Sequence, residues 1–133
     1  MKGFVDDIEG ITSSNKDYRR ILYTGKHVQL VVMSIRKNDE IGEEVHNDRD
    51  QFFRVEEGKG EVVIDGERTK IRPGDGIVVP AGARHNVINT GSKRLRLYTI
   101  YGPPEHKDQI VQATKEEAEA RHHAEEWDGK TTE

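Results

Sequence analysis

The sequence predicts an all-β domain, and three features support that prediction. Short runs rich in Val, Ile, Leu, Phe and Tyr recur between residues 20 and 101. Turns that contain Gly separate these runs, and no helical periodicity lies between them. Asp65-Gly66 joins two of the runs, and this dipeptide favours a type I′ hairpin because both central positions of that turn need positive φ. The pattern is typical of a β-sandwich or barrel and not of an α/β sheet.

Eight runs are expected to be strands, because each is short, rich in β-branched or aromatic residues and closed by a turn. They are residues 20–23, 28–35, 51–55, 61–64, 67–71, 76–79, 86–88 and 95–101. The flanking segments have a different composition. Residues 1–17 form a polar arm in which 12–15 is expected to be loop, and the strands define a barrel unit over 18–104.

Residues 105–133 are expected to form a polar tail with a short C-terminal helix. Thr114 and Glu117 have the spacing of a capping box, and residues 118–127 are rich in helix formers. The apolar stripe of this helix is thin. We therefore expect Trp127 to be the side chain that docks it.

Composition narrows the class of protein. The chain has 133 residues, the length of one domain, and contains no cysteine, which excludes disulfides and cysteine-zinc sites. Its net charge of −4 comes from interspersed charges of both signs, a pattern that argues against a nucleic-acid surface. No apolar run approaches the roughly 18 residues of a membrane span, and the N-terminal stretch is too polar for a signal peptide. We expect a cytoplasmic protein without a membrane partner.

Two histidines lie in segments suited to metal binding. Glu44 and His46 are two residues apart, so on a strand both side chains point to the same face. Asp48 shares that parity, whereas Gln51 has the opposite parity and can join them only if a turn or bulge intervenes, for example at Arg49-Asp50. His85 follows the turn Pro80-Ala81-Gly82, which would hold it at the start of a strand. If the two segments face each other, Glu44, His46, Gln51 and His85 could surround one divalent ion.

A structural alternative stays open at this point. The carboxylates near His46 could form a solvated acidic loop, and His85 could be a capping residue. The other four histidines are expected at the surface: His27 in a turn, and His106, His122 and His123 in the tail. On a helix the adjacent pair His122-His123 cannot point the same way, which would make it a poor chelate.

Two segments resemble the paired motifs of the cupin superfamily. The second motif is complete, with Gly74, five residues, Pro80, one, Gly82, two, His85, three, and Asn89. The first is partial: Gln51 precedes Gly58 by the expected interval, and counting back places His46 and Glu44 on the two histidine positions of the family. The resemblance covers residues 18–101. It implies a double-stranded β-helix, a small jelly-roll barrel, with a metal in its mouth held by Glu44, His46, Gln51 and His85.

The ligand set departs from the usual three histidines and one glutamate of that family. Glu44 stands in place of a histidine and Gln51 in place of the glutamate, so the net ligand charge is unchanged. In having glutamine at this position, the sequence also resembles cupins that are similar to pectin-degradation proteins. Asp48 and Asp50 are the alternatives for the carboxylate. Such a set suits one divalent transition metal ion, Fe, Mn, Ni, Co or Zn.

The resemblance to small phosphomannose-isomerase-like cupins implies isomerase or lyase chemistry on a small oxygen-rich molecule, a sugar or a carboxylate. Asp48, Asp50 or a tyrosine would then act as base. Two alternatives are a dioxygenase with Fe at a two-histidine, one-carboxylate triad, and a non-catalytic module that binds a small ligand. Family members often pair through strands or sheets, so we also expect a homodimer.

Overall fold

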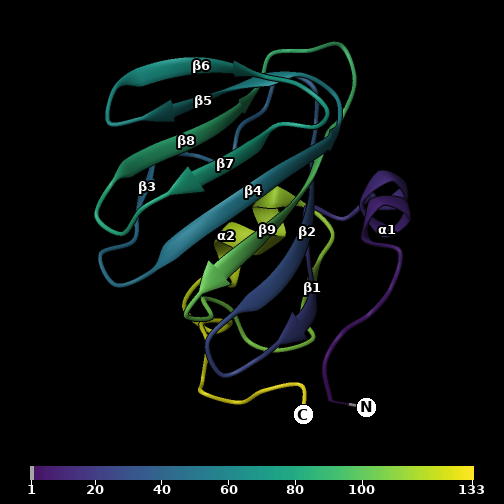
Figure 1. The fold of residues 1–133 in the computed structure, drawn as a ribbon, viewed down its shortest axis with the longest axis vertical. Coiled ribbons are helices and arrows are strands. Elements are labelled where there is room, and N and C mark those ends of the chain that lie inside the picture. Colours follow the sequence, from purple (N-terminus) through teal and green to yellow (C-terminus); the bar gives the residue numbers. More distant parts are fainter. Residues whose placement is uncertain (1) are drawn as a thin grey trace.

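The computed structural model describes residues 2–133, and ten strands in two antiparallel sheets dominate it (Figure 1). The strands are β1 (Arg19–Thr24), β2 (Gln29–Ile35), β3 (Glu44–Val45), β4 (Asp50–Glu57), β5 (Gly60–Ile64), β6 (Glu67–Ile71), β7 (Gly76–Val79), β8 (Arg84–Asn89), β9 (Leu95–Gly102) and β10 (Val111–Gln112). One sheet has the order β10-β1-β2-β9-β4-β7, and the other has the order β3-β8-β5-β6. All eight predicted strands are present within a few residues of their expected bounds. The all-β prediction is therefore confirmed.

Alternating side chains place the core between the two sheets. Along β9 every second residue is buried, from Leu95 to Tyr101, and β8 alternates in the same way. Since successive side chains of a strand point to opposite faces, these residues share one interior face. The fully buried members of the core include Val31, Met33, Ile35, Phe53, Val55, Val87, Leu95 and Leu97. At the β5–β6 turn, Asp65 and Gly66 have φ of 49° and 84°, as a type I′ hairpin requires.

The N-terminal arm contains a helix that the sequence did not predict. Residues 12–14, expected to be loop, belong to α1 (Ile8–Ser14). Asp7 caps this helix by accepting a hydrogen bond from the Gly10 amide (3.1 Å), and the hydroxyl of the buried Thr12 donates to the Ile8 carbonyl (2.7 Å). Arg96 of β9 donates to the Ser13 carbonyl (2.9 Å) and thereby ties α1 to the larger sheet.

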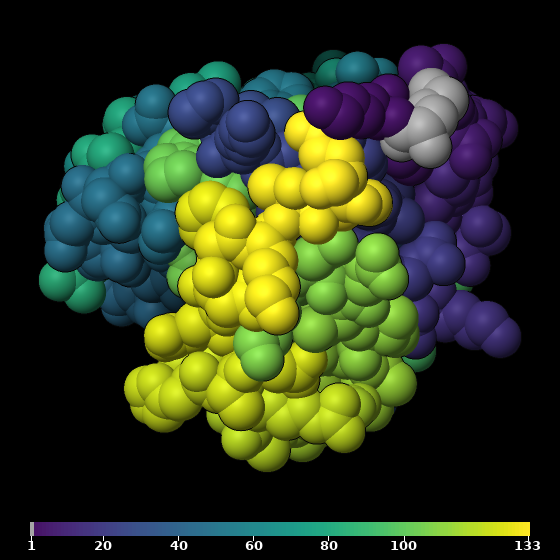
Figure 2. All heavy atoms as spheres, turned by 90° about the horizontal axis from the view of Figure 1, so that it is seen from below, coloured from purple at the N-terminus to yellow at the C-terminus, as the bar shows by residue number. Residues whose placement is uncertain are grey.

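The tail packs against the barrel through strand and helix. β10 pairs with β1, and α2 (Lys115–Ala120) begins as the capping box predicts, with the Thr114 hydroxyl accepting from the Glu117 amide (3.1 Å). The helix ends at Ala120 and not near Trp127, because residues 121–125 form a turn. Neither α1 nor α2, the helices of residues 2–133, is long and apolar enough to cross a membrane. Figure 2 shows the C-terminal segment, in yellow-green and yellow, spread across the lower end of the molecule.

Candidate metal centre

Strand register brings Glu44 and His85 together. The two-residue strand β3 pairs with the start of β8, so that Glu44 lies directly opposite His85. Side chains opposite each other in an antiparallel pair share one face, with Cβ atoms about 4.5–5.5 Å apart. His85 is 5% exposed and lies on the interior face of β8. The short strand thus places a carboxylate beside an interior imidazole.

Backbone hydrogen bonds join the two loops that carry the candidate ligands. The Gly82 amide donates to the His46 carbonyl (2.8 Å), and the Ala81 amide donates to Asp50 Oδ1 (2.8 Å). Gly82 has a φ of +87°, a conformation that favours glycine. The turn before His85 is therefore attached to the loop that carries His46.

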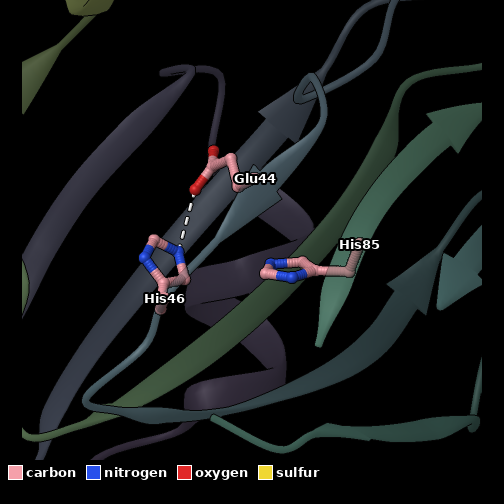
Figure 3. A group of neighbouring side chains, drawn as sticks. All are labelled: Glu44, His46 and His85. Atoms are coloured by element: carbon pink, nitrogen blue, oxygen red, sulfur yellow. Dashed lines mark ion pairs between the residues drawn. The ribbon is translucent and has the colours of Figure 1, made fainter. Parts of the chain in front are cut away.

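Three candidate ligands converge in the space between the sheets (Figure 3). One ligand atom each from Glu44, His46 and His85 lies within 4.8 Å of the other two. His46 Nε2 is 2.9 Å from Glu44 Oε2, and the centroids of the two imidazole rings are 5.4 Å apart. The two segments predicted to face each other do so, and these side chains are spaced as ligands of a common ion require.

In both His46 and His85, the ring nitrogen Nδ1 faces an oxygen outside the cluster. His85 Nδ1 lies 3.1 Å from the Ala83 carbonyl oxygen, which can only accept, so Nδ1 carries the proton and Nε2 keeps its lone pair. His46 Nδ1 lies 3.5 Å from Glu105 Oε2, and Arg49 Nη1 lies 2.6 Å from the same oxygen. His85 Nε2 is thus left for an inner ligand, whereas His46 Nε2 faces Glu44 Oε2 and becomes available when a cation replaces that contact.

Sequence reasoning missed Glu105, which it placed in the polar tail. Its side chain is 14% exposed and faces both His46 and Arg49. Alternation along a strand could not predict this contact, because Glu105 lies beyond the last predicted strand. Its partner Arg49 is 56 positions away in sequence. Arg49 is the signal that could have suggested this contact, because a basic residue close in sequence to the predicted ligand His46 needs an acidic partner.

Electrostatics at the cluster stabilise the charged pair. Burial by itself would raise the pKa of the Glu44 carboxyl, but the contact with His46 and the charge of Arg19 outweigh it and leave that pKa below its usual value. The same contact with Glu44 raises the pKa of His46 against the opposing effect of burial. Glu44 is therefore a carboxylate at neutral pH, the form in which it can bind a cation.

Gln51 fits the role of a further oxygen ligand. It is 5% exposed on the interior side of β4, and its Nε2 donates to Thr99 Oγ1 (2.9 Å). That bond fixes the amide so that Oε1 is left buried without a hydrogen-bond partner. Buried polar atoms without partners are rare, and an amide oxygen is a ligand for divalent ions. A turn at residues 47–48 lies between His46 and Gln51 and accounts for their different parity. The sequence predicted this turn slightly later, at Arg49-Asp50.

The rival carboxylates do not join the cluster. The Asp48 side chain is 72% exposed and lies 3.3 Å from Arg49. Asp50 is exposed, and one of its oxygens accepts the Ala81 amide. Of the acidic residues weighed for this place, Glu44 is the one that the fold turns toward both histidines.

Tyr101 and His106 form an interior wall beside the cluster. The Tyr101 ring meets the His46 ring edge-on with centroids 6.1 Å apart, and its hydroxyl lies 3.4 Å from His106 Nε2. Burial raises the pKa of Tyr101 and lowers the pKa of His106 well below its ordinary value, so both are neutral at pH 7. The expectation that His106 is a surface residue is wrong. It is 7% exposed because Gln29 binds its backbone amide and carbonyl inside the barrel.

Two open hollows in the lower face reach Glu44. One is lined by His46, Arg49, Glu105 and His122 in addition to Glu44, and the other lies against Tyr18, Arg19 and the end of α2. His122 borders both. Two of the three candidate ligands, Glu44 and His46, can therefore be reached from solvent.

The family model of the cupin domain matches residues 31–101, more than half of the chain. The chain belongs to the cupin family. This cupin is 42% identical over 125 residues to a Bacillus subtilis protein, YrkC, itself described as uncharacterized; the match covers 90% of this chain and 67% of YrkC. A solved structure from Bacillus halodurans has 42% sequence identity and a TM-score of 0.88 and covers 90% of this chain and 95% of that one. The cupin is also 33% identical over 89 residues to quercetin 2,3-dioxygenase of Bacillus subtilis, with coverage of 66% of this chain and 26% of the dioxygenase.

These likenesses confirm the double-stranded β-helix that the motif spacing implied. The family match begins inside β2 and ends inside β9, so it includes all four candidate ligands and leaves out Glu105 and the C-terminal segment. Cupins typically bind a divalent metal, and the His/Glu cluster of this cupin is a possible site for one.

Proposed function

We propose that this cupin holds one divalent transition metal ion through Glu44, His46 and His85, with Gln51 as a further oxygen ligand. The ion would serve isomerase or lyase chemistry on a small oxygen-rich molecule, a sugar or a carboxylate. One observation carries the proposal: one ligand atom from each of Glu44, His46 and His85 lies within 4.8 Å of the other two, beside a hollow that Glu44 and His46 line. Two imidazoles and one carboxylate suit Fe, Mn, Ni, Co or Zn.

When bound, such an ion supplies a Lewis acid for a carbonyl or hydroxyl oxygen. The chain's own residues orient and protect that place. Glu105 and Arg49 hold the His46 ring from outside, and the Ala83 carbonyl holds the His85 ring. A hydrogen-bond partner on the ring nitrogen that does not bind the metal fixes the tautomer and the orientation of a ligand imidazole.

Tyr101 is the tyrosine best placed for proton transfer. Its raised pKa makes it a donor and not a base at neutral pH, and the neutral His106 beside its hydroxyl can accept or return a proton. Asp48 and Asp50, which the sequence offered as bases, are exposed and directed to other partners. Tyr101 is therefore a candidate proton donor, and the base stays unassigned.

A dioxygenase is the second candidate, and two observations favour it. A two-histidine, one-carboxylate set with open positions is typical of non-haem Fe(II) oxygenases, and a relative of this chain is named quercetin 2,3-dioxygenase. The experiment that separates the two candidates measures oxygen uptake with the Fe(II)-loaded protein. Uptake that stops without Fe would select the dioxygenase, and turnover with Zn or Mn under anaerobic conditions would exclude it.

Metal content tests the ligand set. Protein without a histidine tag is passed through gel filtration and analysed by mass spectrometry. His85→Ala and Glu44→Ala are expected to lose the ion that wild type keeps, whereas the matched carboxylate control Asp48→Ala keeps it. Full occupancy in both ligand variants would show that the assignment is wrong.

Turnover tests the chemistry. In heavy water, reversible proton abstraction from a sugar or hydroxy acid exchanges deuterium into the remaining substrate at the carbon that loses its proton, and isomerisation also places deuterium at the carbon that gains one. Proton NMR detects both. Retained metal without turnover or oxygen uptake would favour the non-catalytic ligand-binding alternative. The homodimer also stays a prediction, which light scattering measures directly.

A further inference from the structure

A second group of two histidines and one glutamate lies on the turn after α2. The rings of His122 and His123 have centroids 5.1 Å apart, and Glu126 Oε1 lies 3.9 Å from His122 Nε2 and 3.6 Å from His123 Nδ1. One ligand atom from each residue lies within 4.8 Å of the other two. The sequence argument against this pair is wrong, because residues 121–125 form a turn and not the helix that would have separated the rings.

The backbone of this turn is fixed on both sides. The Glu125 amide donates to the Arg121 carbonyl (2.9 Å), and the Lys107 amide donates to the Glu125 carbonyl (2.9 Å). On the other side of Glu126, the Trp127 amide donates to the Glu105 carbonyl (3.1 Å). The three side chains therefore start from an ordered backbone, which lowers the ordering cost of binding a common ligand.

Side-chain contacts leave the cluster open for a ligand. The Arg121 guanidinium reaches Glu117 (2.7 Å) and Glu125 (3.7 Å), so Glu126 is not its partner. The side chains of His122, His123 and Glu126 are 61%, 94% and 56% exposed. As a pure ion pair, a contact between such exposed groups contributes little to stability. Three potential ligand atoms within 4.8 Å of one another, two of them from imidazoles, could instead share one cation.

The position of the turn relates it to the barrel mouth. His122 lines both hollows that reach Glu44, and one of these also contains His46. Figure 2 shows the C-terminal segment crossing this face of the molecule. The outer cluster thus lies at the rim of the openings that lead to the inner one.

We propose that His122, His123 and Glu126 form a second divalent-cation site at the rim of the barrel mouth. Its two imidazoles and one carboxylate select borderline ions such as Zn²⁺, Ni²⁺ and Cu²⁺ over Mg²⁺ or Ca²⁺. It binds more weakly than the inner cluster, because its ligands are exposed and solvent competes for the ion. The site is separate from the proposed function, since it shares no residue with the inner cluster.

Calorimetric titration with Zn²⁺ tests this site. Tag-free protein is stripped with a chelator, dialysed and titrated at neutral pH. Wild type is expected to bind two ions per chain, one tightly and one weakly. His123→Ala should lose the weak ion and keep the tight one, and His85→Ala should do the reverse. His27→Ala, which removes another exposed histidine, should leave both.

Several results would overturn the proposal. A wild type that binds no ion, or a His123→Ala variant that keeps every ion bound by wild type, would show that the outer cluster holds no cation. Glu126→Gln provides a second measurement and should weaken the same site without moving the tight one. Circular dichroism checks each variant, and folding of His123→Ala and Glu126→Gln is expected to survive because these side chains are exposed. Loss of the weak ion in His123→Ala with no change in His85→Ala would uphold the outer site and refute the inner one.

Discussion

Two clusters of the same composition lie near one end of this cupin, and they differ in how the chain builds them. The inner cluster takes Glu44, His46 and His85 from segments about 40 residues apart, joined by the register of β3 with β8. The outer cluster takes its three side chains from five consecutive positions of one turn. The first therefore exists only in the folded barrel, whereas the second joins side chains that are neighbours in sequence, on a segment held by hydrogen bonds to Glu105 and Lys107.

The difference separates two kinds of candidate metal site. Around the inner cluster, Ala83 and Glu105 hold the outer ring nitrogens, and Gln51 adds a buried oxygen without a partner. Around the outer cluster no residue described by the structure performs such a task, and solvent reaches all three side chains. Partners behind the ligands and exclusion of water are the features expected of a tight site.

The largest expected effect is on stability in the presence of metal. An ion that binds the folded state alone stabilises it by about 2.7 kcal/mol at a free concentration of 100 Kd. Since its ligands are brought together only by folding, the inner cluster should provide most of the Zn²⁺-dependent stabilisation, and His85→Ala should abolish it. His123→Ala should change it little, because the local ligands of the outer cluster can also bind the unfolded chain. Thermal unfolding with and without Zn²⁺ measures this stabilisation in both variants. Equal losses of stabilisation in the two variants would contradict the expected difference between the clusters.

The next effect concerns the partner of His46. Glu105→Gln removes the charge that faces His46 Nδ1 while keeping the size of the side chain. Loss of such a partner typically weakens metal affinity by about 10–100-fold. Competition with a chromophoric chelator measures the change at the tight site. Glu116→Gln is the matched control, because Glu116 is an exposed carboxylate of α2, and an equal loss in that variant would point to net charge instead of orientation.

Part of this architecture could be predicted from sequence and part could not. The long strands and the inner ligands follow from local patterns: β-branched runs, Gly turns, and the parity of Glu44 and His46. The two-residue strands β3 and β10 carry too few residues for any periodicity, yet β3 places Glu44 opposite His85. Their pairing is decided by tertiary contacts.

The tail shows the same limit more strongly. Glu105 and His106 look like ordinary polar residues, and their roles come from side chains that are far away in sequence, Arg49 and Gln29. The helix end was misplaced because helix formers continue past Ala120, whereas the chain turns there to hydrogen-bond Lys107 through Glu125. Propensity is a weak prior in such a segment, and tertiary contacts override it.

A third effect compares the buried and exposed histidines of the tail. Burial lowers the pKa of His106 well below 6.5, so the unfolded chain takes up a proton near that pH while the folded protein does not. Stability from this group is present above about pH 6.5 and falls with decreasing pH by up to about 1.4 kcal/mol per unit. His106→Gln should make this decline shallower, as measured by urea unfolding of metal-free protein across that range. His27→Gln should keep the wild-type slope, and an unchanged slope in His106→Gln would contradict the neutral, buried assignment.

The smallest expected effect is on the second Zn²⁺ ion, and it tests whether the outer cluster depends on α2. Thr114→Ala removes the hydroxyl that accepts the Glu117 amide, and loss of such a cap costs about 1 kcal/mol. Because α2 leads directly into the turn that carries His122 and His123, the variant should raise hydrogen exchange in residues 115–126 and weaken the second Zn²⁺ ion. The tight ion should be unaffected, since its ligands are fixed by the sheets. Ser14→Ala is the control, because it removes a hydroxyl from the end of α1, in the other helix. Equal weakening of both ions by Thr114→Ala would mean that the C-terminal segment also supports the inner cluster, through Glu105.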